Sequence, residues 1–354
     1  SGHFDADSID ELLEADGALS FKFEALSLYA FSPWIDYPLT IKDGTGSLSI
    51  NIEFENGKLK EGGSSFSVQN LNAKTLDNAK QDLVFKDING EFKYKLVNDD
   101  INIILDNLFL TTNSKLQFEN SAASIKYNFK TNQINKATLV VDRFDLGSVK
   151  EISNQFLPEE HKTNVIINEL SAKGEIDDLK LKWDRTRDRE EPKLKLKAKF
   201  LELEINEFES FPGLKNITGE VNIENEKGII RSVSRDVKIT KEDVFRAPLQ
   251  LNQFTGSVNW DNQKYSFNEV TIKDDYMEAI FNGTVKYESL DNLYVDINID
   301  SPTLNIPYFK VYYPKQIGED GLGWLDTSLL EGTAENTNIK MKGKVKDFPF
   351  IDEN

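Results

Sequence analysis

Hydrophobic and polar residues alternate with a period of two along most of the chain. From Leu48 to Phe54 every second residue is aliphatic or aromatic, with Ser, Asn and Glu between, and the stretch from Leu293 to Asp300 repeats this alternation. Because successive side chains of a β-strand point to opposite faces, such segments form strands with one apolar and one polar face. The pattern predicts on the order of twenty strands.

Short Asn, Asp and Gly dipeptides punctuate these segments. We interpret Asp43-Gly44, Asn56-Gly57, Asn89-Gly90 and Asn282-Gly283 as tight turns, because these residues tolerate positive φ. Tight turns join antiparallel neighbours. About twenty strands spaced by about 4.8 Å would extend roughly 100 Å, so the sheet must curl or split. The predicted fold is all-β: a long, curled, mostly antiparallel sheet whose concave side forms a U-shaped hydrophobic groove.

Helical segments are few. Ser8 to Glu11 matches a capping box, Leu146 to Phe156 has helical spacing of its apolar residues, and a third candidate lies near residues 321–331. These helices either cap the groove or simply pack on a sheet end. The residues expected to close one end of the groove are Leu322, Trp324, Leu325 and Leu329.

The apolar faces of the alternating strands are the candidate binding surface. A sealed sandwich core is the other interpretation of each such residue. The candidate groove residues are Leu48, Ile50, Ile52, Phe54, Phe92, Tyr94, Leu96, Ile101, Ile103, Leu105, Tyr127, Leu196, Phe200, Val258, Trp260, Phe281, Val295, Ile297 and Ile299.

Composition excludes several classes of function. The 354 residues carry 60 acidic and 42 basic side chains and a formal charge of −18, which disfavours nucleic acid and electrostatic docking on an anionic bilayer. The chain has no cysteine, which suits an oxidising compartment. It starts at Ser1 without an initiator Met or a signal peptide, so we expect a segment excised from a longer protein.

The sequence offers little for catalysis. Only His3 and His161 are histidines, and His161 follows Pro158 and two Glu residues in an expected exposed turn. One usable histidine and no cysteine make a zinc site improbable, and no phosphate-binding loop, calcium loop or dinucleotide fingerprint is present. Acidic pairs such as Asp99-Asp100 and Asp274-Asp275 fall where turns are expected. We therefore expect no enzyme activity, no cofactor and no metal.

The C-terminal third carries a specific set of short motifs. They are Tyr312-Tyr313-Pro314, Gly323-Trp324-Leu325-Asp326, Leu330-Glu331-Gly332-Thr333 and Asp347-Phe348-Pro349-Phe350. This set resembles the YhdP family of AsmA-like proteins, which are related to TamB. The resemblance extends over residues 139–350 and includes Phe211-Pro212-Gly213-Leu214. We therefore divide the chain into an N-terminal strand-rich groove segment, 1–138, and a YhdP-like groove segment, 139–354.

The resemblance implies a large envelope protein of Gram-negative bacteria that works in outer membrane biogenesis. Such a protein is anchored in the inner membrane and extends through the periplasm, and its taco-like sheet carries phospholipid acyl chains between the inner and outer membranes. The expected partners are phospholipids, the two membranes through regions outside this segment, and envelope proteins. The alternative is a periplasmic scaffold or spacer that binds protein partners and has a closed core. An enzyme acting on glycan is a distant third interpretation.

Overall fold

The computed structural model describes residues 2–4, 16–31, 39–75, 82–112, 117–157, 159–185, 192–209, 211–289 and 292–347. The chain divides into two compact units. Unit 1 comprises Ser1–Asn168 and Ile176–Leu196, and unit 2 comprises Glu169–Glu175 and Lys197–Asn354. The division predicted from the sequence at 138/139 stays a prediction.

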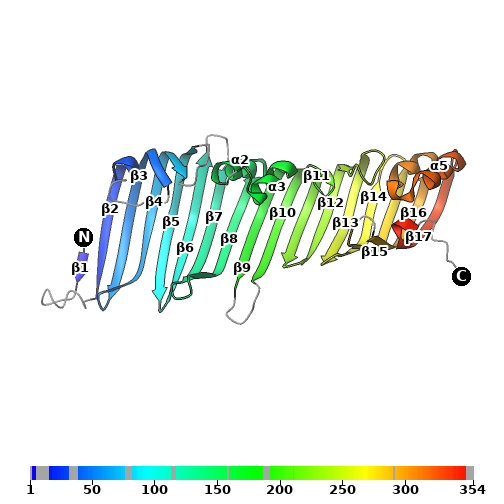
Figure 1. Cartoon of the computed structure of the whole chain (residues 1–354). Helices are drawn as coiled ribbons and strands as arrows, with labels where there is room; N and C mark the ends of the chain where they lie inside the picture. Colours follow the sequence, from blue (N-terminus) through cyan, green and yellow to red (C-terminus); the bar gives the residue numbers. More distant parts are fainter. Residues whose placement is uncertain are drawn as a thin grey trace. The chain divides into compact units, whose positions relative to one another are not determined.

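Unit 1 is built from long antiparallel strands (Figure 1). Its strands are β1 (Gly2–Phe4), β2 (Gly17–Ser27), β3 (Leu39–Glu55), β4 (Lys58–Thr75), β5 (Leu83–Val97), β6 (Asp100–Thr112), β7 (Gln117–Asn128) and β8 (Gln133–Asp145). Its helices are α1 (Leu28–Phe31) and α2 (Gly147–Phe156). Three elements, α3 (Lys162–Leu170), β9 (Lys173–Asp184) and β10 (Lys193–Ile205), contribute residues to both units.

Unit 2 repeats this organisation, with a helical segment between its last two strands. Its strands are β11 (Gly213–Glu224), β12 (Lys227–Thr240), β13 (Leu249–Asp261), β14 (Lys264–Lys273), β15 (Met277–Tyr287), β16 (Leu293–Asn305) and β17 (Thr333–Lys344). The helical segment contains α4 (Ile306–Phe309), two 3-10 turns, Lys310–Tyr312 and Lys315–Ile317, and α5 (Glu319–Ser328). A further 3-10 turn, Val345–Asp347, follows β17.

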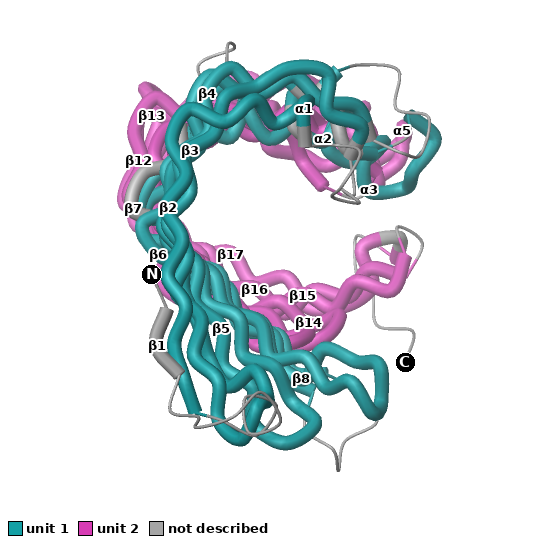
Figure 2. Tube along the Cα trace, turned by 90° about the vertical axis from the view of Figure 1, so that its left-hand side faces the viewer, with its two compact units in different colours: residues 1–168, 176–196 teal, residues 169–175, 197–354 magenta. Residues whose placement is uncertain are grey.

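Within each unit, consecutive strands pair with one another. The pairing is antiparallel from β2 to β8 in unit 1 and from β11 to β17 in unit 2. Figure 2 shows that the strands of unit 1 curve into an open arc, and that those of unit 2, taken by themselves, also curve. The predicted fold class, an all-β chain with a curled, open, antiparallel sheet, is confirmed.

Bulges mark a bend within many of the strands. The register shifts near Gly44 in β3, Asn107 in β6, Gly256 in β13 and Glu269 in β14, and each of these residues has positive φ. A bulge adds one residue to its strand, bends it and increases the local twist. It also shifts the alternation by one position. The apolar positions therefore stay on one face although their spacing in the sequence changes from two to three residues.

The buried core lies at the end of the strands where the helices are found. In unit 1 the buried side chains of Ile41, Leu71, Ala73 and Phe85 form one cluster, and Leu28 of α1 packs against it. Figure 2 shows α1 on the inner side of the arc of unit 1. The apolar face of unit 1 is therefore its concave face.

Several turn predictions were wrong. Asn56-Gly57 is a turn between β3 and β4, as predicted, but Asp43-Gly44, Asn89-Gly90 and Asn282-Gly283 lie inside β3, β5 and β15. At Gly44 and Gly283 the glycine permits positive φ within a strand rather than at a hairpin. Gly90 is paired within β5 and does not have positive φ.

Two helix predictions were confirmed within a few residues. Helix α2 begins one residue after the predicted Leu146, and α5 covers most of the predicted 321–331 segment. The predicted capping box at Ser8–Glu11 lies outside the described residues. Helix α3 was not predicted. It packs beside α2 through polar contacts, in which the Ser153 hydroxyl donates to the buried Asn164 Oδ1 at 2.7 Å.

Candidate functional site

The register of unit 1 aligns apolar side chains into rows that cross the strands on one face. The aligned residues of one row are Phe21, Ile50, Ser64, Phe92, Leu105, Ala123 and Leu139. Those of a second row are Leu19, Ile52, Gly62, Tyr94, Ile103, Ile125 and Ala137. All the candidate groove residues of β3, β5, β6 and β7 lie on this same face, which we call the apolar face of unit 1.

Much of this face is open to solvent. Phe21 is 42% exposed and Phe23 is 37% exposed, whereas Ala73 in the helix-covered cluster has no exposed surface. Most of the other side chains in the rows are half-buried by their neighbours on the sheet. The end of the face beneath α1 is sealed, as is the region of Val141 in β8, whereas the rows described above stay partly exposed.

Unit 2 has a corresponding apolar face. The aligned residues of its central row are Val221, Ile230, Val258, Phe267, Gly283, Ile297 and Met341. The candidates Val258, Trp260, Phe281 and Ile297 are half-buried on this face. Three other candidates, Phe200, Val295 and Ile299, are buried, and their place in the groove stays a prediction. Leu196 is half-buried in β10.

The opposite face of each sheet is polar. In unit 1, Glu61 lies directly across from Lys95 and forms an ion pair at 2.5 Å, and in unit 2, Lys227 pairs with Asp261 at 2.7 Å. Exposed pairs of this kind contribute little to stability. They place charged groups on the outer face, and the extended apolar rows described above lie on the other face.

A shallow hollow of about 610 Å³ lies mainly on the polar face of unit 1. Its lining includes Asn51, Glu61, Lys93 and Asn102, whose side chains belong to the polar rows. Glu61 is already paired with Lys95. The hollow therefore gathers solvated groups of the outer sheet surface, and we do not assign it a site.

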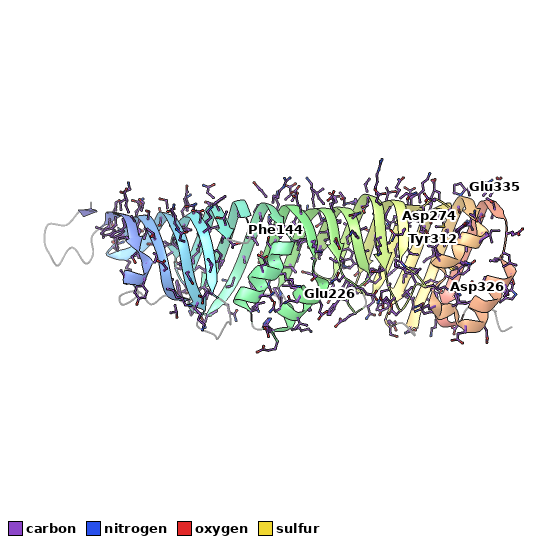
Figure 3. All side chains as sticks on the ribbon, turned by 90° about the horizontal axis from the view of Figure 1, so that it is seen from above. Phe144, Glu226, Asp274, Tyr312, Asp326 and Glu335 are labelled. Carbon is purple, nitrogen blue, oxygen red and sulfur yellow. The ribbon has the colours of Figure 1, made fainter. Side chains whose placement is uncertain are left out.

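The helical segment of unit 2 is fastened to the ends of the strands by polar contacts. The Tyr312 hydroxyl donates to Asp274 Oδ2 at 2.5 Å (Figure 3). The Arg246 guanidinium donates to both carboxylate oxygens of Asp326 at 2.9 Å. Burial, together with the neighbouring Asp274 carboxylate, raises the pKa of Tyr312 well above its usual range. Burial and the Asp326 carboxylate also raise the pKa of Tyr313.

Helix α5 carries three of the four predicted groove-end residues, and the fourth, Leu329, directly follows its last residue. Leu322, Leu325 and Leu329 are half-buried, as their spacing predicts, while Trp324 is 64% exposed. Whether this helix closes a groove stays a prediction. The Arg246–Asp326 contact holds this helix, and the Tyr312–Asp274 contact holds a 3-10 turn before it; sequence reasoning missed both because the paired residues are 80 and 38 positions apart.

The described residues show no arrangement typical of catalysis. His161 is exposed, and no group of three or more His, Asp or Glu side chains in the described ranges could hold a metal ion. In the same ranges no helix is long and apolar enough to cross a membrane. The feature that distinguishes both units is the extended, partly open apolar face.

The fold and the candidate site together define a class of protein, in which an open, curled antiparallel sheet has one extended apolar face. The chain belongs to the YhdP protein family, whose model matches residues 8–354. It is similar to the intermembrane phospholipid transporter YhdP of Escherichia coli (strain K12), with 22% identity over 165 residues. The match covers 45% of this chain and 13% of that protein. No solved structure gives a significant match.

Proposed function

We propose that the chain is a segment of a non-enzymatic lipid-transport protein whose apolar faces hold phospholipid acyl chains. The observation that carries the proposal is the row of apolar side chains that crosses the strands of each unit while remaining partly open to solvent. A structural core would be sealed by a second layer. A surface that carries long hydrocarbon chains needs instead to be continuous and accessible.

The energetics suit an unspecific apolar ligand. Burying one CH₂ group contributes about 0.8 kcal/mol, so ten buried CH₂ groups contribute about 8 kcal/mol without any polar contact. In this proposal the acyl chains lie on the apolar face and the head groups remain at its edge. There the hairpin turns carry exposed polar residues such as Asn56, Asp99 and Lys130. Selectivity for the head group is expected to be low.

The proposal extends to the setting of the protein. We infer a periplasmic location, with passive movement of phospholipid between inner and outer membranes and an inner-membrane anchor elsewhere in the full protein. The support is membership of the YhdP family and the similarity to a protein named as an intermembrane phospholipid transporter. Lipid would move along the faces by diffusion, and the donor and acceptor membranes would set its direction.

The first test is whether the segment carries lipid. Native mass spectrometry of the gently purified protein, followed by lipid extraction, should reveal bound phospholipid from the expression host. A photoreactive amino acid at Ile103 on the apolar face should crosslink to that lipid. The same residue at the neighbouring Ile104, which lies on the polar face, should not.

Two other outcomes would contradict the proposal. A lipid-free mass with no crosslink at either position would overturn the proposal and favour a scaffold that binds protein partners. Crosslinking of equal yield at both positions would mean that lipid contacts the sheet without regard to its faces.

A further inference from the structure

Two glycines that are paired within strands, one inside β5 and one near the start of β12, have no positive φ that would require glycine. Gly90 in β5 and Gly228 in β12 are both paired in the sheet, and neither has positive φ. Glycine within a strand weakens it, because glycine loses more backbone entropy on folding and has no side chain to pack. The cause must therefore lie in what occupies the space where a side chain would be.

An aromatic ring occupies that space at both positions. Gly90 lies directly across from Phe66, and a Cβ atom added to Gly90 would be 2.9 Å from Phe66 Cζ. Gly228 lies directly across from Trp260, and its added Cβ would be 2.2 Å from Trp260 Cζ2 and 2.4 Å from Cη2. Each ring therefore lies over the backbone of the glycine, and at Gly228 all of the nearest atoms belong to the indole.

Three other glycines of the two sheets lack this arrangement, in which the nearest atoms to the added Cβ belong to a facing aromatic ring. Gly62 also lies under a ring, with its added Cβ 2.8 Å from Tyr94 Cε1, but it would meet the Asn51 carbonyl oxygen at 2.7 Å as well. The adjacent Gly63, on the polar face, meets nothing closer than 3.3 Å. Gly283 faces Phe267 across the strands, yet its nearest atoms are backbone atoms of β16.

We propose that Gly90 and Gly228 keep the space above the apolar faces open for acyl chains. Because neither glycine has a side chain, the facing ring of Phe66 or Trp260 lies against the sheet and does not project into that space. This inference rests on the proposed lipid-binding function. The two glycines are positioning residues: they act on the lipid through Phe66 and Trp260.

The distances predict a graded effect of alanine. Two carbon atoms pack at about 3.5–4.0 Å, so the indole would have to move by more than about 1 Å in Gly228→Ala, whereas the phenyl ring would move by about half as much in Gly90→Ala. The sheet backbone blocks movement downward, and the displaced ring therefore rises into the space above the face. Gly63→Ala is the matched control, since its added methyl group meets no ring.

Fluorescence quenching of Trp260 can report how exposed its indole ring is. The chain has four tryptophans, and replacing Trp34, Trp183 and Trp324 by phenylalanine leaves Trp260 as the single fluorophore. In delipidated protein, Gly228→Ala should increase quenching of Trp260 by acrylamide, and Gly63→Ala should leave it unchanged. In protein purified with its lipid, Gly228→Ala should lose bound phospholipid, and adding Trp260→Leu should restore it.

The outcomes separate the inference from the function on which it rests. If the parent protein carries no phospholipid, the proposed function fails. The quenching experiment still tests whether Gly228 determines the position of the Trp260 ring. Unchanged quenching in Gly228→Ala, or lipid loss that Trp260→Leu does not reverse, would overturn the inference. If Gly228→Ala fails to fold, Gly90→Ala with and without Phe66→Leu gives the same test through lipid count. Equal lipid content in that series would also refute the inference.

Discussion

A single charge on the apolar face should stop lipid binding without unfolding the sheet, and Ile103→Asp is the sharpest form of this test. Ile103 of β6 lies directly between Tyr94 of β5 and Ile125 of β7, so acyl chains held as proposed would pass over it. Its neighbour Ile104 points to the polar face, where it is 40% exposed and lies across from Lys93. Ile104→Asp is therefore a matched control with the same chemical change in the same strand.

The magnitude follows from the surroundings of the new carboxylate. A carboxylate in hydrocarbon surroundings costs about 2.5–3.5 kcal/mol on insertion scales. Each 1.4 kcal/mol corresponds to about tenfold in affinity, so binding across this position should weaken roughly 60- to 300-fold. In lipid-free protein, Ile103→Asp should lower the unfolding free energy by only about 1 kcal/mol, because Ile103 is half-buried and the substitution removes little buried apolar surface.

Two measurements check the prediction on the same samples. Native mass spectrometry counts the bound phospholipids, and thermal unfolding followed by circular dichroism reports stability. We expect Ile103→Asp to lose lipid and Ile104→Asp to keep it, with small shifts of Tm in both. The reasoning is refuted if the two variants carry as much lipid as the parent protein, or if both lose it equally.

Three further predictions concern residues that stabilise the folded sheets. Tyr312→Phe should lower the unfolding free energy by about 1–2 kcal/mol, because the Asp274 carboxylate loses its buried donor. Since the fold raises the pKa of Tyr312 above its ordinary 10.0, this contribution is complete below pH 10.0 and declines only above it, which thermal melts in alkaline buffers would show. Leu71→Ala in the sealed cluster should cost about 2–5 kcal/mol, against less than about 1 kcal/mol for Leu59→Ala, as denaturant titration would measure. Asn107→Val should cost about 1–2 kcal/mol, because a β-branched residue resists positive φ at the β6 bulge, and Asn107→Gly should be tolerated; equal losses in both would contradict this.

Period-two alternation was enough to predict the faces of the sheet from the sequence. The residues from Leu48 to Phe54 were predicted to share a face at every second position, and the register of β3 with β2 and β4 places them so. Alternation depends only on the geometry of a strand. It does not reveal how far neighbouring side chains bury a residue on that face, so the half-buried Ile297 could not be distinguished from the buried Val295 and Ile299.

Glycine dipeptides were the weakest guide. Asn89-Gly90 resembles a hairpin turn, yet the apolar positions Ile88 and Phe92 on either side continue the alternation, and this continuity was the available sign of an unbroken strand. Glycine is selected both for positive φ and for close approach of another group. Only the opposing Phe66, which is 24 positions away in the sequence, distinguishes these two causes here.

Helix α3 could not be predicted from a hydrophobic pattern because its contact with α2 is polar. Asn164 is fully buried and accepts from Ser153, and the Asn168 amide donates to Asn154 Oδ1 at 2.7 Å. Asparagine is a poor helix former in isolation, so tertiary contacts determine this short helix. The Arg246–Asp326 pair was equally inaccessible, since nothing local relates its two members.

Within each unit, strands that are consecutive in sequence pair with one another, so a hairpin is the repeating element of such a sheet. Inserting or deleting one hairpin would leave all the other registers intact and would change the width of the sheet by about 10 Å, since each strand adds about 4.8 Å. The length of such a protein can thus vary during evolution while its cross-section, and with it the ligand it accommodates, stays the same. Duplication of a hairpin is accordingly a simple genetic route from a short protein of this type to a much longer one.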